Sequence, residues 1–154
     1  MITREEFESL LPLACARAEE QERIILRDGV ALTTGQVADA RRIGVGQPER
    51  VRVRVVEEIP LPTHPGLRKA AEMTGLISPL MIGLTFRYGI FIQAESWGER
   101  RLVVHELVHT AQYEPLGGFR AFLEQYLHEC ITIGYPEAPL EQEARRIERK
   151  LCRK

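Results

Sequence analysis

The sequence predicts an α+β fold in which a small, mostly antiparallel sheet packs on one central helix, with further helices around it. Two observations predict this fold class. Apolar side chains recur at helical spacing in several stretches, above all in residues 99–113. Apolar and polar side chains alternate in residues 50–57, and two further β-rich runs occupy residues 81–86 and 88–93.

The N-terminal part is predicted to be helical. Thr3 and Glu6 have the spacing of a capping box, and the amphipathic stretch behind them continues to a turn at residues 28–29. Pro12 lies within this stretch, at a point where the helix can split or kink. A second, shorter helix is predicted over residues 34–42, because a threonine precedes it and glycines follow it.

The middle of the chain is predicted to supply the strands. In residues 50–57 the valines face one side of the strand and the arginines face the other. Three prolines surround His64 and predict a stiff surface loop, because proline cannot pair in a central strand. The runs 81–86 and 88–93 predict two more strands, with a turn or bulge near Arg87.

The stretch from Glu99 to Tyr113 predicts the central helix. It contains no glycine or proline, and its apolar residues form a broad stripe at helical spacing. Pro115, which two glycines follow closely, predicts the end of the helix. His105 and His109 are four residues apart in this stretch, so they should project from one face.

Residues 105–109 spell H-E-x-x-H, the most informative pattern in the chain. Two imidazoles one helical turn apart can bind the same Zn²⁺. Glu106 then lies beside the metal, where it can accept a proton from a zinc-bound water. The pattern therefore predicts His105 and His109 as zinc ligands and Glu106 as a general base.

A catalytic zinc site needs a third protein ligand, which leaves the fourth position for water. A helix predicted between Gly117 and Gly134 would carry the chain back toward the motif, and another helix should begin near Pro139. These residues alone leave six candidates for the third ligand, namely His128, Glu129, Cys130, Glu137, Glu141 and Glu143.

HELVHTAQY, followed by E-x-E-A in a later helix, resembles the gluzincin type of zinc metallopeptidase, and especially the small zincin-like domains of largely uncharacterised bacterial families. The resemblance covers residues 85–150 and implies a zincin-like fold. It implies Glu141 as the third ligand, with Ala144 matching the family's alanine. Arg145 departs from the family's Asp or Asn, which supports a ligand histidine by hydrogen bonding.

The resemblance implies two further features. In related peptidases a Tyr, His or Arg near the zinc stabilises the oxyanion of the tetrahedral intermediate, and Tyr135 is the expected residue here. In zincin folds the strand before the motif helix lies at the cleft and pairs with extended substrate. That strand would be residues 88–93.

The length and composition of the chain are those of a single domain. The chain has 154 residues, of which 44% are hydrophobic, which suits a single zincin-like domain with one core. Residues 1–46 would form its helical N-terminal part and residues 50–154 its catalytic core. The 21 basic and 22 acidic residues give a net charge of −1, which argues against a nucleic-acid partner.

Three cysteines, Cys15, Cys130 and Cys152, form no C-x-x-C pair, so neither a disulfide framework nor a cysteine zinc ribbon is expected. The acidic, amphipathic N-terminus does not have the character of a secretory signal. No stretch reaches the ~20 apolar residues of a membrane span. The sequence thus predicts a cytoplasmic protein without a membrane partner.

Together these features predict a zinc-dependent metallopeptidase that hydrolyses peptide bonds of a peptide or protein substrate with a zinc-activated water and Glu106 as general base. An alternative is a non-catalytic zinc module with a peptidase-like fold that docks or regulates a partner. A third hypothesis is a helical domain that binds no metal. Metal content of the purified protein separates the last alternative from the two zinc hypotheses.

Overall fold

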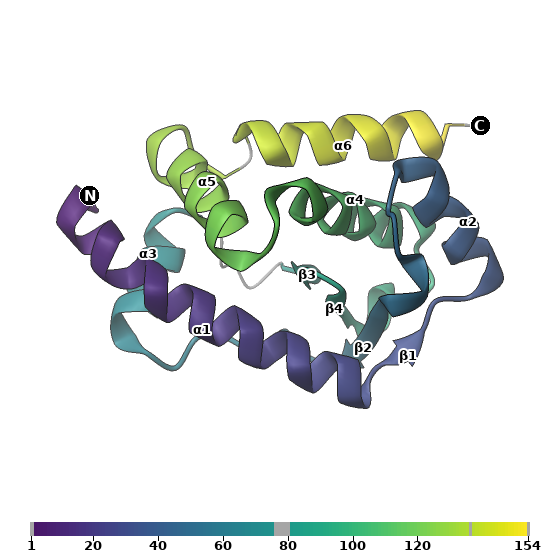
Figure 1. Ribbon diagram of the computed structural model, residues 1–154, viewed down its shortest axis with the longest axis horizontal. Coiled ribbons are helices and arrows are strands. Elements are labelled where there is room, and N and C mark those ends of the chain that lie inside the picture. Colours follow the sequence, from purple (N-terminus) through teal and green to yellow (C-terminus); the bar gives the residue numbers. More distant parts are fainter. Residues whose placement is uncertain (1, 76–80, 136, 154) are drawn as a thin grey trace.

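The computed structural model describes residues 2–75, 81–135 and 137–153 (Figure 1). Within these ranges the chain forms six α-helices, four strands and two 3₁₀ turns. In chain order the elements are α1 (Arg4–Asp28), β1 (Val30–Ala31), α2 (Thr34–Ile43), η1 (Pro48–Arg50), β2 (Arg52–Val56), α3 (Pro65–Met73), β3 (Gly83–Phe86), β4 (Gly89–Gln93), η2 (Ala94–Ser96), α4 (Arg100–Leu116), α5 (Phe119–Thr132) and α6 (Pro139–Leu151). The predicted α+β class is confirmed.

The four strands form one mixed sheet in the order β1-β2-β4-β3. β1 pairs with β2 and β3 pairs with β4 in antiparallel fashion, whereas β2 runs parallel to β4 from Arg52 opposite Gly89 to Val56 opposite Gln93. The sheet is therefore less purely antiparallel than expected. The parallel pairing arises because the chain leaves β2, passes through α3 and returns to the sheet through the β3–β4 hairpin.

The sheet separates two groups of buried side chains. Ile90 and Ile92 of β4 face α2 and α4, where they pack with Val103 and Leu107. Phe91, between them in sequence, faces the other side and packs in a second group with residues of α1 and α5. In Figure 1, α1 runs along one side of the sheet, α4 along the other, and α6 lies outside α4.

The predicted capping box at the start of α1 is present, and α2 begins with another one. Thr3 Oγ1 accepts from the backbone N–H of Glu6 at 3.1 Å, and the side chain of Glu6 accepts from the backbone N–H of Thr3. Thr33 and Gln36 form the same arrangement at the start of α2. α1 nevertheless continues through Pro12 without dividing, which fits the exposed position of this proline, because water can hydrate the carbonyl that it leaves without a helical donor.

The proline-rich segment around His64 was predicted as a loop only, and this prediction misses α3. Pro65 occupies the first turn of the helix, where its missing N–H has no helical partner to lose. His64 Nδ1 accepts hydrogen bonds from the backbone N–H groups of Gly66 and Leu67 at 3.1 and 3.3 Å, so this histidine caps the helix. No residue of α3 is fully buried.

The central helix is longer than predicted. α4 passes Pro115 and ends after Leu116, where Gly117 adopts a left-handed φ of 81°. Pro115 costs the helix one hydrogen bond, to the carbonyl of Ala111, and it is tolerated because only one helical residue follows it, so there is almost no helix left to kink. The glycine therefore ends the helix, as the left-handed conformation is open to glycine at low cost.

A partly buried ion pair joins α1 to the β3–β4 hairpin. The Glu22 side chain, 4% exposed, accepts from Arg87 Nη2 at 2.6 Å and from Arg87 Nε at 2.8 Å. It also accepts from the backbone N–H of Tyr88 at 3.1 Å. Arg87 holds this position with a left-handed φ of 57°, so the pair fixes both the turn and the helix that crosses it.

We expect Arg87→Ala to lower the free energy of unfolding by about 2–3 kcal/mol, because the Glu22 carboxylate stays buried without its partner. Alanine keeps the same left-handed backbone requirement, so the substitution reports on the side chain. Arg27→Ala is the matched control, since its pair with Asp28 is exposed and its loss should change the free energy of unfolding much less. Urea unfolding of both variants checks the prediction, and equal losses would contradict it.

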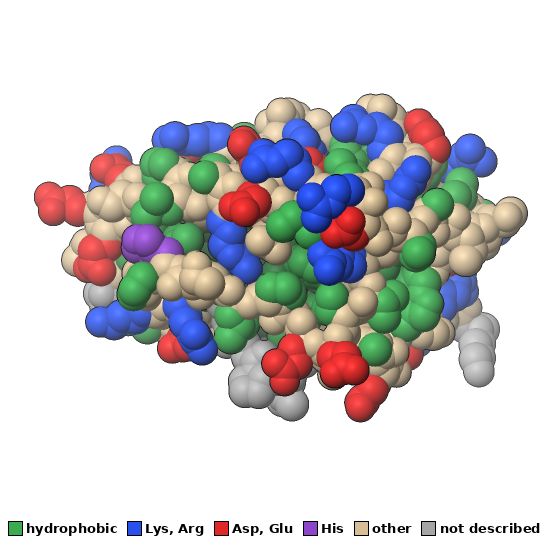
Figure 2. All heavy atoms as spheres, turned by 90° about the horizontal axis from the view of Figure 1, so that it is seen from below, with side chains coloured by type: hydrophobic (Ala, Val, Ile, Leu, Met, Phe, Trp, Pro, Cys, Tyr) green, Lys and Arg blue, Asp and Glu red, His purple; other side chains and the backbone are tan. Residues whose placement is uncertain are grey.

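The surface carries charges of both signs. Figure 2 shows Lys and Arg side chains intermixed with Asp and Glu side chains on one face, with apolar surface between them. This mixture agrees with the net charge of −1. None of the described helices combines the length and the apolar character that crossing a membrane requires.

Candidate metal centre

Three side chains from two helices converge at one point. His105 Nε2 of α4 lies 2.7 Å from Glu141 Oε1 of α6, and His109 Nε2 lies 3.2 Å from Glu141 Oε2. The three potential ligand atoms all lie within 4.8 Å of one another. Ligand atoms bound to one tetrahedral Zn²⁺ at about 2.0–2.2 Å are roughly 3.3 Å apart, so the group fits the metal after small adjustments.

Local sequence explains how the group forms. The two histidines are one turn apart on α4, and Glu141 stands in the first turn of α6, which packs along α4. Ala144 is fully buried, and its small side chain permits close approach of the two helices. The Glu141 side chain is only 1% exposed, so its carboxylate needs cationic or hydrogen-bonding partners.

The other candidates for the third ligand lie elsewhere. Glu143 Oε1 accepts a hydrogen bond from Gln112 Nε2 at 2.9 Å. His128, on α5, packs its ring edge against Phe7. Within the described ranges, no other set of three histidine, cysteine or acidic side chains can share an ion, so no such set includes Glu129, Cys130 or Glu137.

The carboxylate and the imidazoles shift each other's proton affinity. Burial would raise the pKa of Glu141, but hydrogen bonds from His105 and His109 outweigh it and hold the pKa well below its ordinary value. Burial would also lower the pKa of His109, but the hydrogen bond to Glu141 and the charges of Glu106 and Glu141 raise it to about 9. Without metal, His109 is therefore protonated at neutral pH.

Zinc binding should consequently release a proton. A metal ligand must be a neutral imidazole, so below pH 9 the affinity for zinc should fall by about tenfold per pH unit. Calorimetric titration with zinc at pH 7.5, in two buffers of different ionisation enthalpy, measures the released proton. A His64→Ala variant, which removes an exposed histidine outside the group of three ligands, should release the same number, and identical enthalpies in both buffers would contradict the prediction.

A glutamine orients His109. Gln112 Oε1 lies 2.8 Å from His109 Nδ1, while Gln112 Nε2 donates to the carbonyl of Leu140 and to Glu143, both at 2.9 Å. Because both partners of Nε2 are acceptors, the amide can have only this orientation, and His109 Nδ1 must donate to Oε1. Nε2 of His109 is thereby directed toward Glu141, as a metal ligand requires.

Gln112 was not predicted as a site residue. The resemblance placed the supporting residue at position 145, where this chain has arginine, and the structure supplies the support from α4 instead. The available signal was spacing, since Gln112 follows His109 by three residues and so lies on the same helical face.

Glu106 lies beside the three ligands without joining them. It is 5% exposed, and its Oε1 accepts a hydrogen bond of 2.7 Å from Thr85 Oγ1 of β3. β3 approaches so closely that a Cβ on Gly83 would lie 3.0 Å from Glu106 Oε2. Glycine at this position therefore leaves room for the carboxylate.

Two tyrosines complete the surroundings of Glu141. Tyr126 and Tyr135 donate to its two oxygens at 3.0 and 3.3 Å. Burial, followed by the charge of Glu141, raises the pKa of both hydroxyls, so both stay protonated donors at neutral pH. Tyr135 therefore lies at the site as predicted, with its oxyanion role still a prediction, and Tyr126 was missed.

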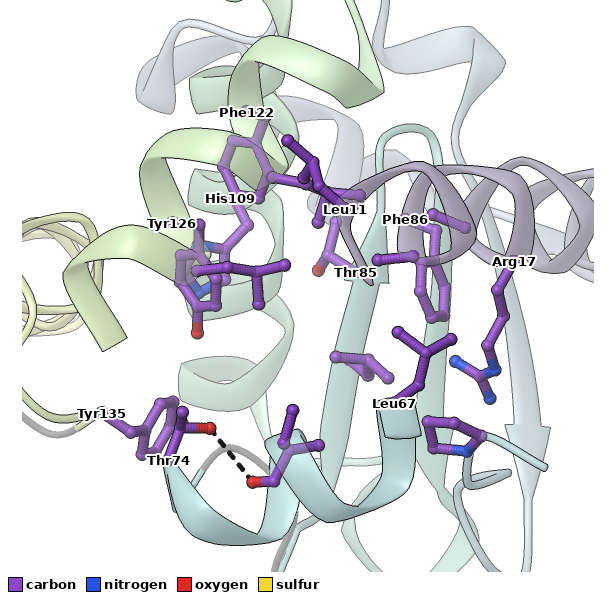
Figure 3. Close-up of a pocket in the computed structure, with 18 of the residues that line it drawn as sticks. Leu11, Arg17, Leu67, Thr74, Thr85, Phe86, His109, Phe122, Tyr126 and Tyr135 are labelled. Atoms are coloured by element: carbon purple, nitrogen blue, oxygen red, sulfur yellow. Dashed lines mark hydrogen bonds between the residues drawn. The ribbon is translucent and has the colours of Figure 1, made fainter. Parts of the chain in front are cut away.

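An apolar cavity of about 170 Å³ opens beside these groups (Figure 3). His109, Tyr126 and Tyr135 line one side of it, and Phe86, Leu67 and Arg17 line the other. A dry apolar cavity of roughly 150 Å³ accommodates a benzene molecule, so this one can hold a large apolar side chain. Its walls come from α1, α3, α4, α5, all four residues of β3 and Glu141 of α6.

The strand expected to bind substrate is corrected. Residues 88–93 largely form β4, which lies between β2 and β3 and has both edges paired. In the part of the chain that the structure describes, β3 is the strand at the edge on this side of the sheet. β3 carries Thr85 and Gly83, so the edge strand itself contacts Glu106.

No protein-family model, no curated protein and no solved structure matches this chain. The candidate site is therefore defined by its own geometry, in which His105, His109 and Glu141 face one another with Glu106 alongside.

Proposed function

We propose that this protein is a zinc-dependent metallopeptidase of the gluzincin type with a zincin-like fold. The observation that carries the proposal is the convergence of His105, His109 and Glu141, with the carboxylate of Glu106 held separately beside them. Zn²⁺ bound in this way acts as a Lewis acid and lowers the pKa of a bound water to about 7.

The composition of the group favours catalysis over a structural role. A structural zinc site normally has four protein ligands, whereas the described residues supply three here. A structural site also needs no unligated carboxylate at its edge. The adjacent cavity gives a substrate access to the group, which a non-catalytic docking module would not need.

Side chains of the protein would carry out the proton transfers and stabilise the developing charge. Glu106 takes a proton from the attacking water and delivers it to the leaving amine. Thr85 fixes the carboxylate of Glu106 through the hydrogen bond of 2.7 Å. Tyr135 is the proposed donor to the developing oxyanion, for which its protonated hydroxyl is suited.

β3 offers a docking edge for an extended peptide. The backbone N–H of Gln93 donates to the carbonyl of Ile82 at 2.9 Å, so this pair belongs to the hydrogen-bonded set of the ladder. Hydrogen-bonded and non-bonded residues alternate in an antiparallel pair, which directs the backbone groups of Gly83 and Thr85 away from β4. A substrate added as a strand would use these groups.

The test combines metal content with cleavage. We expect the protein purified without chelator to contain about one equivalent of zinc, and to cleave members of a broad peptide library in a chelator-sensitive manner. Zinc without cleavage would overturn the peptidase and favour the docking module. Absence of zinc would overturn both.

A further inference from the structure

Arg145 has an unsatisfied group beside the candidate metal centre. Its Nε is buried, and among the described residues it is the one such side-chain atom without a hydrogen-bond partner. A buried donor without a partner is unfavourable, so such a group often has a functional explanation. Arg145 follows Glu141 by four residues on α6 and therefore projects on the same face.

Arg145 lines a second depression that meets the apolar cavity at the metal centre. His105, Glu106, Tyr135 and Glu141 line both spaces, whereas Arg145 lines only the second one. We call this second space the outer pocket. A substrate that spans the centre would thus meet apolar walls on one side and a guanidinium on the other.

The acidic residues nearby are engaged with other partners. Glu148, in the outer pocket, lies 3.7 Å from Arg101 and 3.9 Å from His105 Nδ1. Glu143 lies 3.9 Å from Arg146. Three arginines and two glutamates line the outer pocket apart from Glu106 and Glu141, namely Arg101, Arg145, Arg149, Glu99 and Glu148.

We propose that Arg145 binds a carboxylate of the substrate, so that the enzyme acts on peptides with a negative charge close to the cleaved bond. The proposal rests on the proposed function. The guanidinium presents its donors in a planar fork that matches a carboxylate, and Nε is one of the two donors of its side-on arrangement. The carboxylate is either the C-terminal group or the side chain of Asp or Glu.

Cleavage of matched peptide pairs distinguishes a C-terminal carboxylate from an Asp or Glu side chain. It also distinguishes substrate binding by Arg145 from stabilisation of the oxyanion by Arg145. One pair differs in a C-terminal carboxylate or amide, and the other pair differs in Asp or Asn beside the cleaved bond. We expect one carboxylate member to have a lower KM, and Arg145→Gln to raise that KM by about 10- to 100-fold with little change in kcat. An equal fall in kcat for both members of each pair would overturn the proposal.

Arg146→Gln is the matched control, since its side chain is 68% exposed on the same helix. We expect it to preserve the preference of the wild type. Arg145→Lys should restore little of the preference, because an ammonium lacks the planar fork. Full rescue by lysine would contradict bidentate binding.

A binding experiment tests the proposal without activity. The probes are the monohydroxamates of malonic, succinic and glutaric acid and their amides, because a hydroxamate chelates zinc and leaves the second carboxylate free. Calorimetry on the zinc-loaded wild type should show that at least one of the acids binds about tenfold more tightly than its amide. Arg146→Gln should keep this difference in affinity, and Arg145→Gln should lose it. No preference at any length overturns this proposal alone, whereas absence of zinc overturns the proposed function as well.

Discussion

Glu106→Gln should abolish hydrolysis while leaving zinc in place. Glu106 is not among the three convergent ligands, so metal content should stay near that of the wild type. A glutamine cannot accept the proton of the attacking water, and loss of a general base lowers kcat by about 10²–10⁴-fold. The substitution preserves shape, and the hydroxyl of Thr85 can still donate to the amide oxygen.

Zinc analysis and cleavage assays on the same preparation check this expectation. Glu124→Gln is the matched control, because Glu124 is an exposed carboxylate on α5 that pairs with Arg120 across one helical turn. That variant should keep both zinc and activity. Retention of more than about a tenth of the activity in Glu106→Gln would assign the base to another residue, and loss of zinc would make Glu106 a ligand.

Elements with strong local signals were predictable from the sequence. The capping box at Thr3 forms as predicted, and α2 begins next to Thr33, as the threonines at this position predicted. α3 was missed because the three prolines around His64 were taken to predict a loop, whereas Pro65 is favourable in the first turn of a helix. The parallel pairing of β2 with β4 depends on contacts between distant segments, which no local pattern encodes.

The candidate site likewise combines residues that local sequence spacing predicts with residues that only tertiary packing brings together. His105, Glu106 and His109 lie within one helical turn, so their sequence spacing determines their geometry. The contacts of Thr85 and Gln112 depend on how β3 and α6 pack against α4. Residues brought together by packing have no fixed sequence separation, and neither the unpaired Nε of Arg145 nor the cavity has a sequence signature.

Glu141→Ala should remove zinc from the protein. Two imidazoles one turn apart remain, but loss of the carboxylate removes the third bond and the negative charge that offsets the metal. We expect the affinity for zinc to fall by more than about 100-fold, since even residues that only support ligands contribute 10–100-fold. Zinc analysis after dialysis, followed by competition with a chelator of known affinity, measures the change.

Glu143→Ala is the control that decides between neighbouring carboxylates. Glu143 lies two residues further along α6 and accepts a hydrogen bond from Gln112, so its loss should weaken zinc binding by no more than about tenfold. A larger loss of zinc affinity in Glu143→Ala than in Glu141→Ala would identify Glu143 as the third ligand.

Folding must be separated from metal loss in Glu141→Ala. Removal of the carboxylate takes away the main partner that raises the pKa of His109, so the buried imidazole becomes neutral and loses a hydrogen bond, at a cost of about 1–3 kcal/mol in the metal-free protein. Glu141→Gln avoids part of this cost, because its amide oxygen can still accept from Tyr126. A folded Glu141→Gln protein, verified by circular dichroism, that binds zinc as tightly as the wild type would show that the carboxylate is not the third ligand.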